Sequence, residues 1–230
     1  MRQQTQAVLQ QYDMIESYLT PPQMMLSLGG GYEYVDLGLP SGLKWAKCNI
    51  GAATETEYGD YFMWGSVTPN TADECRWASY THCDGSFKTL TKYNTSTSYG
   101  KNPDNITVLG PEDDAATHIM GGDWRMPTKA EFDELSEKTD NQWIANYNGT
   151  GVNGRKFTSK TDKNKYIFIP TAGYCNNGSV DSVGGNGSVW SSSLYTSGPG
   201  NAWYLNFHQG NYGVSNSPRY LGLSVRGVRK

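Results

Sequence analysis

The sequence predicts an α+β fold made of short antiparallel sheets, two helices and long irregular loops. Glycine accounts for 27 of the 230 residues and aromatic residues for 13%, whereas only 18% are charged. This composition is typical of a loop-rich domain that can still bury a core, since charged residues usually make up about 25% of a chain. Beyond residue 31, two segments have helical signals and about seven have strand signals.

The charge balance argues against nucleic acid as a partner. The chain has 19 Lys and Arg against 22 Asp and Glu, a net charge of −3, whereas non-specific nucleic-acid binding needs a basic face. No apolar run reaches the roughly 18 residues that span a bilayer, so no membrane span is predicted. Residues 1–6 lack the apolar segment of a signal peptide. This fits a chain that is not exported, a phage-borne chain or one whose leader has been removed.

Residues 1–31 are predicted to form an N-terminal helical arm followed by a hinge. A single apolar stripe has the spacing of a helix and consists of Val8, Tyr12, Ile15 and Leu19. Pro21 and Pro22 end this helix, and Gly29–Gly31 forms the hinge. So short a helix is only marginally stable alone. Residues 1–28 are therefore expected to pack on their own domain, on a second copy or on a larger particle.

Residues 32–230 are predicted to form one domain, which begins with strands and irregular segments. Residues 34–46 have the pattern of a strand, a turn and a second strand. Residues 58–65 are rich in aromatic side chains and are expected in the core. Residues 66–106 are polar and irregular, which indicates a long insertion.

Two helices are predicted in the middle of this domain. Residues 111–121 open with proline and acidic residues and close with glycine, the asymmetry of a short helix. Thr128 and Glu131 have the spacing of a capping box at the start of the second helix. Phe132 and Leu135 of that helix are expected to face the core.

Further strands are predicted at residues 156–159, 166–170, 189–193, 202–207 and 222–229. Within residues 203–208, apolar and polar side chains alternate, which is the period of a half-buried strand. We therefore expect Trp190, Leu205 and Phe207 to be buried. Four side chains are expected to be exposed and to cluster on one face, namely Tyr204, His208, Tyr212 and Tyr220.

Signals for catalysis or metal binding are weak. The chain has no HExxH, GxSxG or P-loop motif, and the helix start explains the acidic run at residues 112–114. Cys75 and Cys83 could close a nine-residue loop as a disulfide, but free thiols are favoured, and a zinc site would need further ligands. We predict no enzyme activity, no cofactor and no metal site.

The most informative segment is residues 182–218, which carries no charged side chain. Ser, Asn, Gly and Tyr make up 23 of its 37 residues. This is the composition of antibody combining loops, where tyrosine supplies rigid contact area and Ser and Asn supply adaptable hydrogen bonds. A Gly/Ser-rich loop without a task is the alternative, but the aromatic and apolar residues among these positions favour a framework that holds the polar ones outward.

The motifs resemble those of C-type-lectin-fold proteins. Residues 122–132 read GDWRMPTKAEF, which is similar to the GWRLPTxxEW segment of that fold. Proteins of this fold include the formylglycine-generating-enzyme-like proteins and the variable proteins of diversity-generating retroelements. Residues 35–46, 59–65 and 169–174 resemble the related major-paralogous-domain proteins, and residues 190–226 resemble a retroelement variable region. The resemblance implies a C-type lectin fold over residues 32–230, with a variable region at about 189–228.

Such retroelements mutate template adenines, and an altered Asn codon can encode most residue types but not Lys, Glu, Gln, Met or Trp. Between residues 195 and 221, only Trp203 and Gln209 fall outside that set. The resemblance implies a framework of Trp190, Ala202, Trp203, Leu205, Phe207, Val214, Arg219 and Gly222. The implied variable, ligand-binding positions are Tyr195, Thr196, Ser197, Gly198, Asn201, Tyr204, Asn206, His208, Asn211, Tyr212, Ser215, Asn216, Ser217, Tyr220 and Leu221.

The expected function is therefore non-enzymatic binding of a protein or glycan ligand through a diversified site. The alternative is a secreted or surface glycan-binding or adhesion domain without diversification. Calcium-binding lectins of this fold carry Glu-Pro-Asn or Gln-Pro-Asp and Trp-Asn-Asp motifs, which are absent here, as is a match to the paired cysteines of formylglycine-generating enzymes. The resemblance to phage tropism proteins implies a virion or bacterial-surface location and a homo-oligomer, with a trimer favoured, through residues 1–28.

Overall fold

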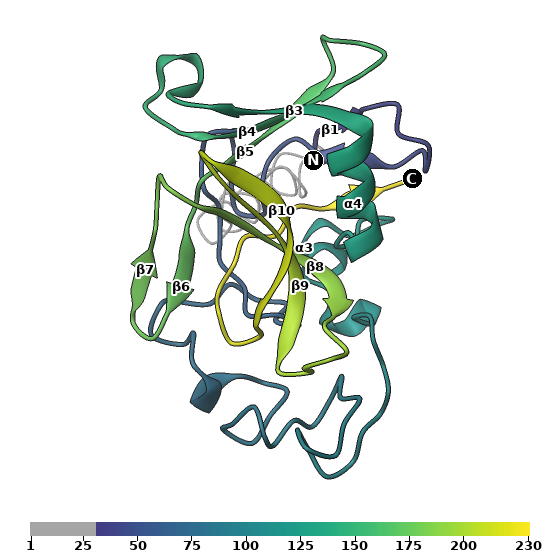
Figure 1. The fold of residues 1–230 in the computed structure, drawn as a ribbon, viewed down its shortest axis with the longest axis vertical. Helices are drawn as coiled ribbons and strands as arrows, with labels where there is room; N and C mark the ends of the chain where they lie inside the picture. The colour runs from purple at the N-terminus through teal and green to yellow at the C-terminus, as the bar shows by residue number, and fades with distance from the viewer. Residues whose placement is uncertain (1–30) are drawn as a thin grey trace, which may run out of the picture. The chain divides into compact units, whose positions relative to one another are not determined.

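Four small antiparallel sheets and two α-helices build the part of the chain that the computed structural model describes, residues 31–230 (Figure 1). The predicted α+β class is confirmed. Residues Tyr34–Lys230 form one compact unit. The helix predicted within residues 1–28, which is expected to mediate self-association or docking, lies outside the described residues.

The central sheet consists of three long strands from the uncharged segment. Its order is β10–β9–β8, with β8 at Gly187–Leu194, β9 at Asn201–His208 and β10 at Asn211–Pro218. The predicted strands at 189–193 and 202–207 are thus confirmed, whereas β10 was not predicted. Gly187 is required by packing, because a Cβ there would lie 1.9 Å from Phe207 Cζ on the neighbouring strand.

A second sheet joins the two ends of the unit. It contains β1 (Tyr34–Asp36), β2 (Lys44–Ala46) and β11 (Val228–Arg229) in the order β1–β2–β11. The strand–turn–strand predicted at residues 34–46 is confirmed. The strand predicted at 222–229 is mostly wrong. Residues 222–224 make only isolated bridges, to three different segments, so this buried stretch connects elements and does not extend a sheet.

The third sheet packs with the longer helix. It has the order β3–β4–β5, with β3 at Thr139–Ile144, β4 at Gly154–Ser159 and β5 at Tyr166–Pro170. Helix α4 spans Lys129–Lys138 and begins with the predicted capping box, in which the Thr128 and Glu131 side chains each accept from the other's backbone N–H. Phe132 and Leu135 are fully buried, as predicted.

The shorter helix departs from its prediction. Residues 111–121 form a 3-10 turn, η2 (Pro111–Asp113), followed by α3 (Ala115–Met120). Asp114 separates them in an extended conformation and caps α3 by accepting from the Thr117 N–H. Its carboxylate also accepts from the Met126 N–H at 2.8 Å. The helix thus begins four residues later than the proline suggests, because Asp114 is shared with the segment before α4.

The main core lies where these sheets meet α4. It includes Trp45, Phe132, Phe157, Ile167, Val189, Leu205 and Phe207. The aromatic segment at 58–65 lies outside this cluster, but its residues Phe62, Met63 and Trp64 are all buried as predicted.

Residues 66–106 are largely irregular, as predicted, and contain the short 3-10 helix η1 (Trp77–Ser79). A further hairpin was not predicted and consists of β6 (Tyr174–Asn176) and β7 (Ser179–Asp181).

Candidate functional site

The β9–β10 hairpin has two chemically different faces, set by its register. Tyr204 pairs with Ser215, Asn206 with Gly213 and His208 with Asn211. Directly paired residues share a face of a sheet and successive residues alternate. These positions therefore lie on one face, the polar face, together with Ser217, which pairs with Ala202.

The opposite face belongs to the core. Leu205 and Phe207 are 0% exposed, and Val214 of β10 packs against the same cluster. The predicted burial of Leu205, Phe207 and Trp190 is confirmed. Helix α4 contacts all three strands of this sheet, so the backbone under the polar face is supported by a packed interior.

Trp190 supports the polar face from its β8 side. It pairs with Tyr204 across the ladder, and the two rings meet edge to face at 6.0 Å. The Trp190 indole N–H donates to the Phe62 carbonyl at 2.8 Å. Tyr204 is half-buried and hydrogen-bonds the Ser215 side chain, and burial raises the pKa of its hydroxyl. Tyr204 therefore presents a neutral, oriented hydroxyl.

Tyr212 lies on the other face, so the predicted single cluster of tyrosines is wrong. Its register partner is the core residue Phe207, and its ring packs under the Arg155 guanidinium at 4.4 Å. Arg155 also donates to the His208 carbonyl at 3.3 Å. Tyr212 remains 39% exposed because it lies on the edge strand β10, next to the β9–β10 turn. The sequence shows the alternation of apolar and polar side chains within β9, but it does not show how β10 pairs with β9, which decides the face on which Tyr212 lies.

Tyr220 follows β10 and contacts the insertion. Its ring lies 5.2 Å from that of Trp77, and its hydroxyl donates to Asn176 Oδ1 of β6 at 3.2 Å. Leu221, also predicted as a variable position, is buried, so its side chain is not available to a ligand in this structure.

The remaining predicted positions lie at or near the surface. Tyr195 packs edge to face on Trp203 at 5.0 Å, and the Lys129 ammonium lies 5.0 Å from the Trp203 ring. Asn201 donates to Asn216 across the hairpin at 2.8 Å. The exposed members of the predicted set are Thr196, Ser197, His208, Asn211 and Tyr212, and the half-buried ones are Tyr195, Gly198, Asn201, Tyr204, Asn206, Ser215, Asn216, Ser217 and Tyr220.

Three aromatic rings of the insertion at residues 66–106 form a row next to the predicted variable positions. Trp77, next to Tyr220, is 6.1 Å from Phe87, which is 6.0 Å from Tyr99. Phe87 is 42% exposed. A Cβ on Gly200 would lie 3.3 Å from Phe87 Cβ and 3.5 Å from Tyr99. The row therefore lies against the loop before β9. Sequence reasoning missed it because only the tertiary fold brings the insertion to the hairpin.

Arg219 fixes the insertion to the hairpin. It is fully buried, and its guanidinium donates to the Tyr80 hydroxyl and to the carbonyls of Lys92, Tyr93 and Pro199, at 2.7 to 3.1 Å. Its guanidinium also lies 4.8 Å from the Trp64 ring. The resemblance assigned Arg219 to the framework, and these contacts give that role a physical basis.

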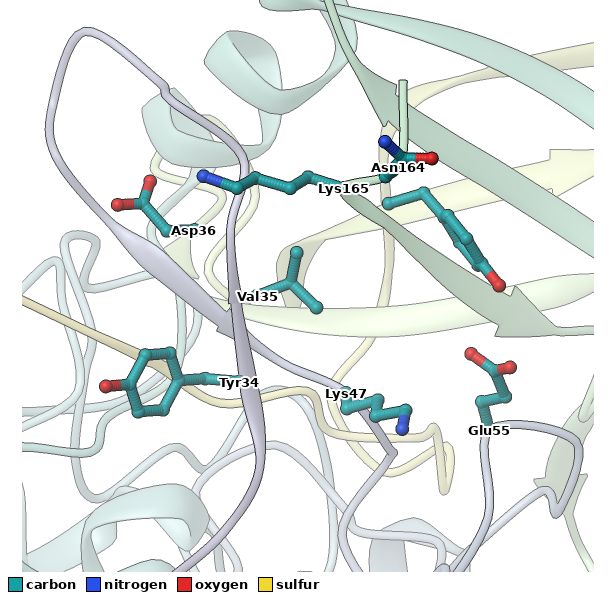
Figure 2. Close-up of a pocket in the computed structure, with 8 residues that line it drawn as sticks. Tyr34, Val35, Asp36, Lys47, Glu55, Asn164 and Lys165 are labelled. Carbon is teal, nitrogen blue, oxygen red and sulfur yellow. The ribbon is translucent and has the colours of Figure 1, made fainter. Parts of the chain in front are cut away.

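A separate pocket of about 360 Å³ lies between β1 and β5 (Figure 2). Its lining includes charged side chains of both signs, among them Asp36, Lys47, Glu55 and Lys165. The Glu55 carboxylate accepts a hydrogen bond from the Tyr147 hydroxyl at 2.8 Å. The Tyr147 hydroxyl also lies within hydrogen-bond distance, 3.1 Å, of the Tyr166 hydroxyl. None of the predicted variable residues lines this pocket.

The described residues contain no group of three or more His, Cys, Asp or Glu side chains placed to hold a metal ion. Within the same part of the chain, no helix has the length and hydropathy to cross a membrane. Cys75 and Cys83 are not joined by a disulfide. The Cys83 thiol instead donates to the Trp77 carbonyl at 3.3 Å.

A family model described as "Domain of unknown function (DUF8237)" matches residues 149–228. The match runs from η3 (Tyr147–Gly149) to the start of β11 and contains the whole central sheet. No curated protein and no solved structure matched the chain.

Proposed function

We propose that this chain is a non-enzymatic binding protein that presents a diversified combining surface on a C-type-lectin-like scaffold. The variable proteins of diversity-generating retroelements work in this way. The ligand is a protein or a glycan, and the chain acts on a phage virion or a bacterial surface. Residues 1–28 serve as a self-association or docking arm, with a trimer as the expected assembly.

The observation that carries this proposal is the division of β9. Leu205 and Phe207 are fully buried, whereas the alternating positions Tyr204, Asn206 and His208 retain access to solvent. Buried side chains fix the backbone, while exposed ones can change at a cost of usually less than about 0.5 kcal/mol each. A surface of this kind accepts many sequences on one fold, as combining sites must.

The chemistry of the surface favours recognition over catalysis. The predicted variable positions are uncharged, and they offer hydroxyls, amides and tyrosine rings. Such groups give adaptable hydrogen bonds and rigid contact area, the features of antibody paratopes. They provide no activated nucleophile with a base beside it, which acyl or phosphoryl transfer would need.

The alternative function is glycan binding or adhesion without diversification. The aromatic row Trp77–Phe87–Tyr99 favours it, because these rings belong to the insertion and lie outside the predicted variable region. Flat aromatic rings next to neutral hydrogen-bonding groups are suited to ligands that have both apolar and polar faces.

Sequencing the DNA that flanks the gene distinguishes these two functions. The diversified site requires a reverse transcriptase gene and a second copy of the segment encoding about residues 189–228, differing from it only at adenines of the copy. If the flanking DNA contains neither a reverse transcriptase gene nor such a copy, the proposal of a diversified site is wrong, and the adhesion domain without diversification is the remaining function.

Substitution tolerance tests the surface directly. The triple variant Asn206→Ser, His208→Asn and Asn211→Ser should melt within a few degrees of the wild type, since each of these side chains is at least partly exposed to solvent. The matched control Leu205→Ala, on the same strand, should lose about 2–5 kcal/mol because it leaves a cavity. Similar losses in both variants would mean that the polar face is structural.

A further inference from the structure

Cys75 and Cys175 meet in the interior, although one belongs to the insertion and the other to β6. Their side chains are 0% and 1% exposed. Both belong to a small apolar cluster with Met63 and Tyr80. The two thiols share a hydrogen bond, in which the Cys75 thiol is the donor.

Gly222 makes room for this meeting. It bonds to Cys175 in both directions, with N···O distances of 2.8 and 3.1 Å. A Cβ on Gly222 would lie 2.6 Å from Cys75 Sγ and 2.9 Å from Cys175 Cβ. The absent side chain therefore leaves the space in which the Cys75 sulfur approaches Cys175.

Backbone hydrogen bonds hold the two segments in place without a covalent bond. The Asn177 N–H donates to the Cys75 carbonyl and the Gly178 N–H donates to the Ala72 carbonyl, each at 2.9 Å. The segment around Cys75 is thereby fixed to the β6–β7 turn.

We propose that Cys75 and Cys175 form a disulfide site, closed while the chain folds and before the two thiols are buried, by exchange with a low-molecular-weight disulfide such as oxidised glutathione. In the first step, one protein thiolate attacks oxidised glutathione, forms a mixed disulfide and releases one glutathione thiolate. In the second, the other protein thiolate attacks the protein sulfur of that mixed disulfide and releases the second glutathione. The two cysteines lose two protons and two electrons, and one oxidised glutathione becomes two reduced molecules.

The surroundings distinguish the two thiols. The hydrogen bond from Cys75 lowers the pKa of Cys175 and raises the pKa of Cys75. Cys175 is therefore the better thiolate. Cys83 is differently placed, since its thiol donates to the backbone carbonyls of Trp77 and Tyr80.

The cross-link would also brace the neighbourhood of Tyr220. Cys75 lies two residues before Trp77, whose ring packs on the ring of Tyr220. Cys175 directly precedes Asn176, whose side chain accepts a hydrogen bond from the Tyr220 hydroxyl. A bond between the cysteines would therefore hold Trp77 and Asn176, the two residues that contact Tyr220, at a fixed separation.

The test is refolding of the full chain in a buffer of reduced and oxidised glutathione, followed by non-reducing peptide mapping and thiol titration. We expect one linked peptide pair containing Cys75 and Cys175, and a mass two hydrogens below that of the reduced chain. The melting temperature should rise by roughly 5–15 °C, because the bond closes a loop of about 100 residues. Dithiothreitol should reverse both changes.

Two variants provide the controls. The double variant Cys48→Ser and Cys83→Ser retains only the proposed pair and should still cross-link. Cys175→Ser should lose both the link and the gain in melting temperature. A Cys75–Cys83 peptide in the wild type, or a double variant that folds and keeps both thiols reduced, would overturn the proposal.

Discussion

Replacing Arg219 by lysine should loosen the contact between the insertion and the β9–β10 hairpin. The guanidinium of this buried residue reaches four acceptors, which lie in three separate segments of the chain. Two of them, the Tyr93 and Pro199 carbonyls, share one nitrogen, at 3.0 Å each. A lysine ammonium has three donors on a single atom and cannot span this arrangement.

The expected loss can be estimated from these contacts. Hydrogen bonds to a charged group contribute about 1.5–3 kcal/mol each, and a buried acceptor left unpaired costs about 1–3 kcal/mol. If lysine keeps about half of the bonds, the free energy of unfolding should fall by about 3 kcal/mol. Methionine, which keeps none, should cost about 5 kcal/mol, near the upper end for breaking a buried charged contact.

Urea denaturation followed by circular dichroism measures this change, and amide hydrogen exchange shows where it acts. We expect faster exchange in residues 80–100 of Arg219→Lys, because this segment loses hydrogen bonds from Arg219 to Tyr80, Lys92 and Tyr93. Arg76→Lys is the control, since Arg76 is exposed and should change stability by less than about 0.5 kcal/mol. If Arg219→Lys unfolds at the same urea concentration as the control, Arg219 does not fix the insertion.

Three further changes can be measured in the same assay. Thr128→Ala removes the capping box of α4 and should cost about 1 kcal/mol; an unchanged midpoint would contradict the capping role. Gly187→Ala places a Cβ 1.9 Å from Phe207 Cζ and should cost about 1–3 kcal/mol, whereas Gly213→Ala, which meets nothing within 4 Å, should cost less; equal losses would argue against the packing reason. Burial lowers the pKa of His82, so only the unfolded chain takes up its proton near pH 6.5, and stability should fall as pH drops below that value; His82→Gln should remove this slope, and an identical slope would refute the assignment.

Local signals predicted the elements that local interactions build. The α4 helix was predicted because Thr128 and Glu131 lie within one turn, and their reciprocal bonds are visible from spacing alone. The alternation in β9 identified Leu205 and Phe207 as core residues, because the two-residue period of a strand does not depend on its partners.

Long-range contacts produced the departures. Asp114 delays the start of α3 because it also binds the Met126 N–H, twelve residues away. Residues 222–224 resemble a strand but bridge to Cys175, Phe62 and Val189 in turn. The sequence offered Cys83 as the possible partner of Cys75, with free thiols favoured, whereas the fold places Cys75 against Cys175, one hundred residues away. Composition carries no signal for such pairings.

The two faces of the hairpin limit how one ligand could use the predicted positions. Tyr204 belongs to the polar face, and Tyr212 belongs to the face that packs under Arg155. A flat ligand surface can reach one of these tyrosines but not both. Only a ligand that curves around the hairpin tip, where His208 pairs with Asn211, can contact the two together. Changes at Tyr204 and Tyr212 would therefore alter two adjoining surfaces, and the exposed tip between them is the place where a single ligand would sense both.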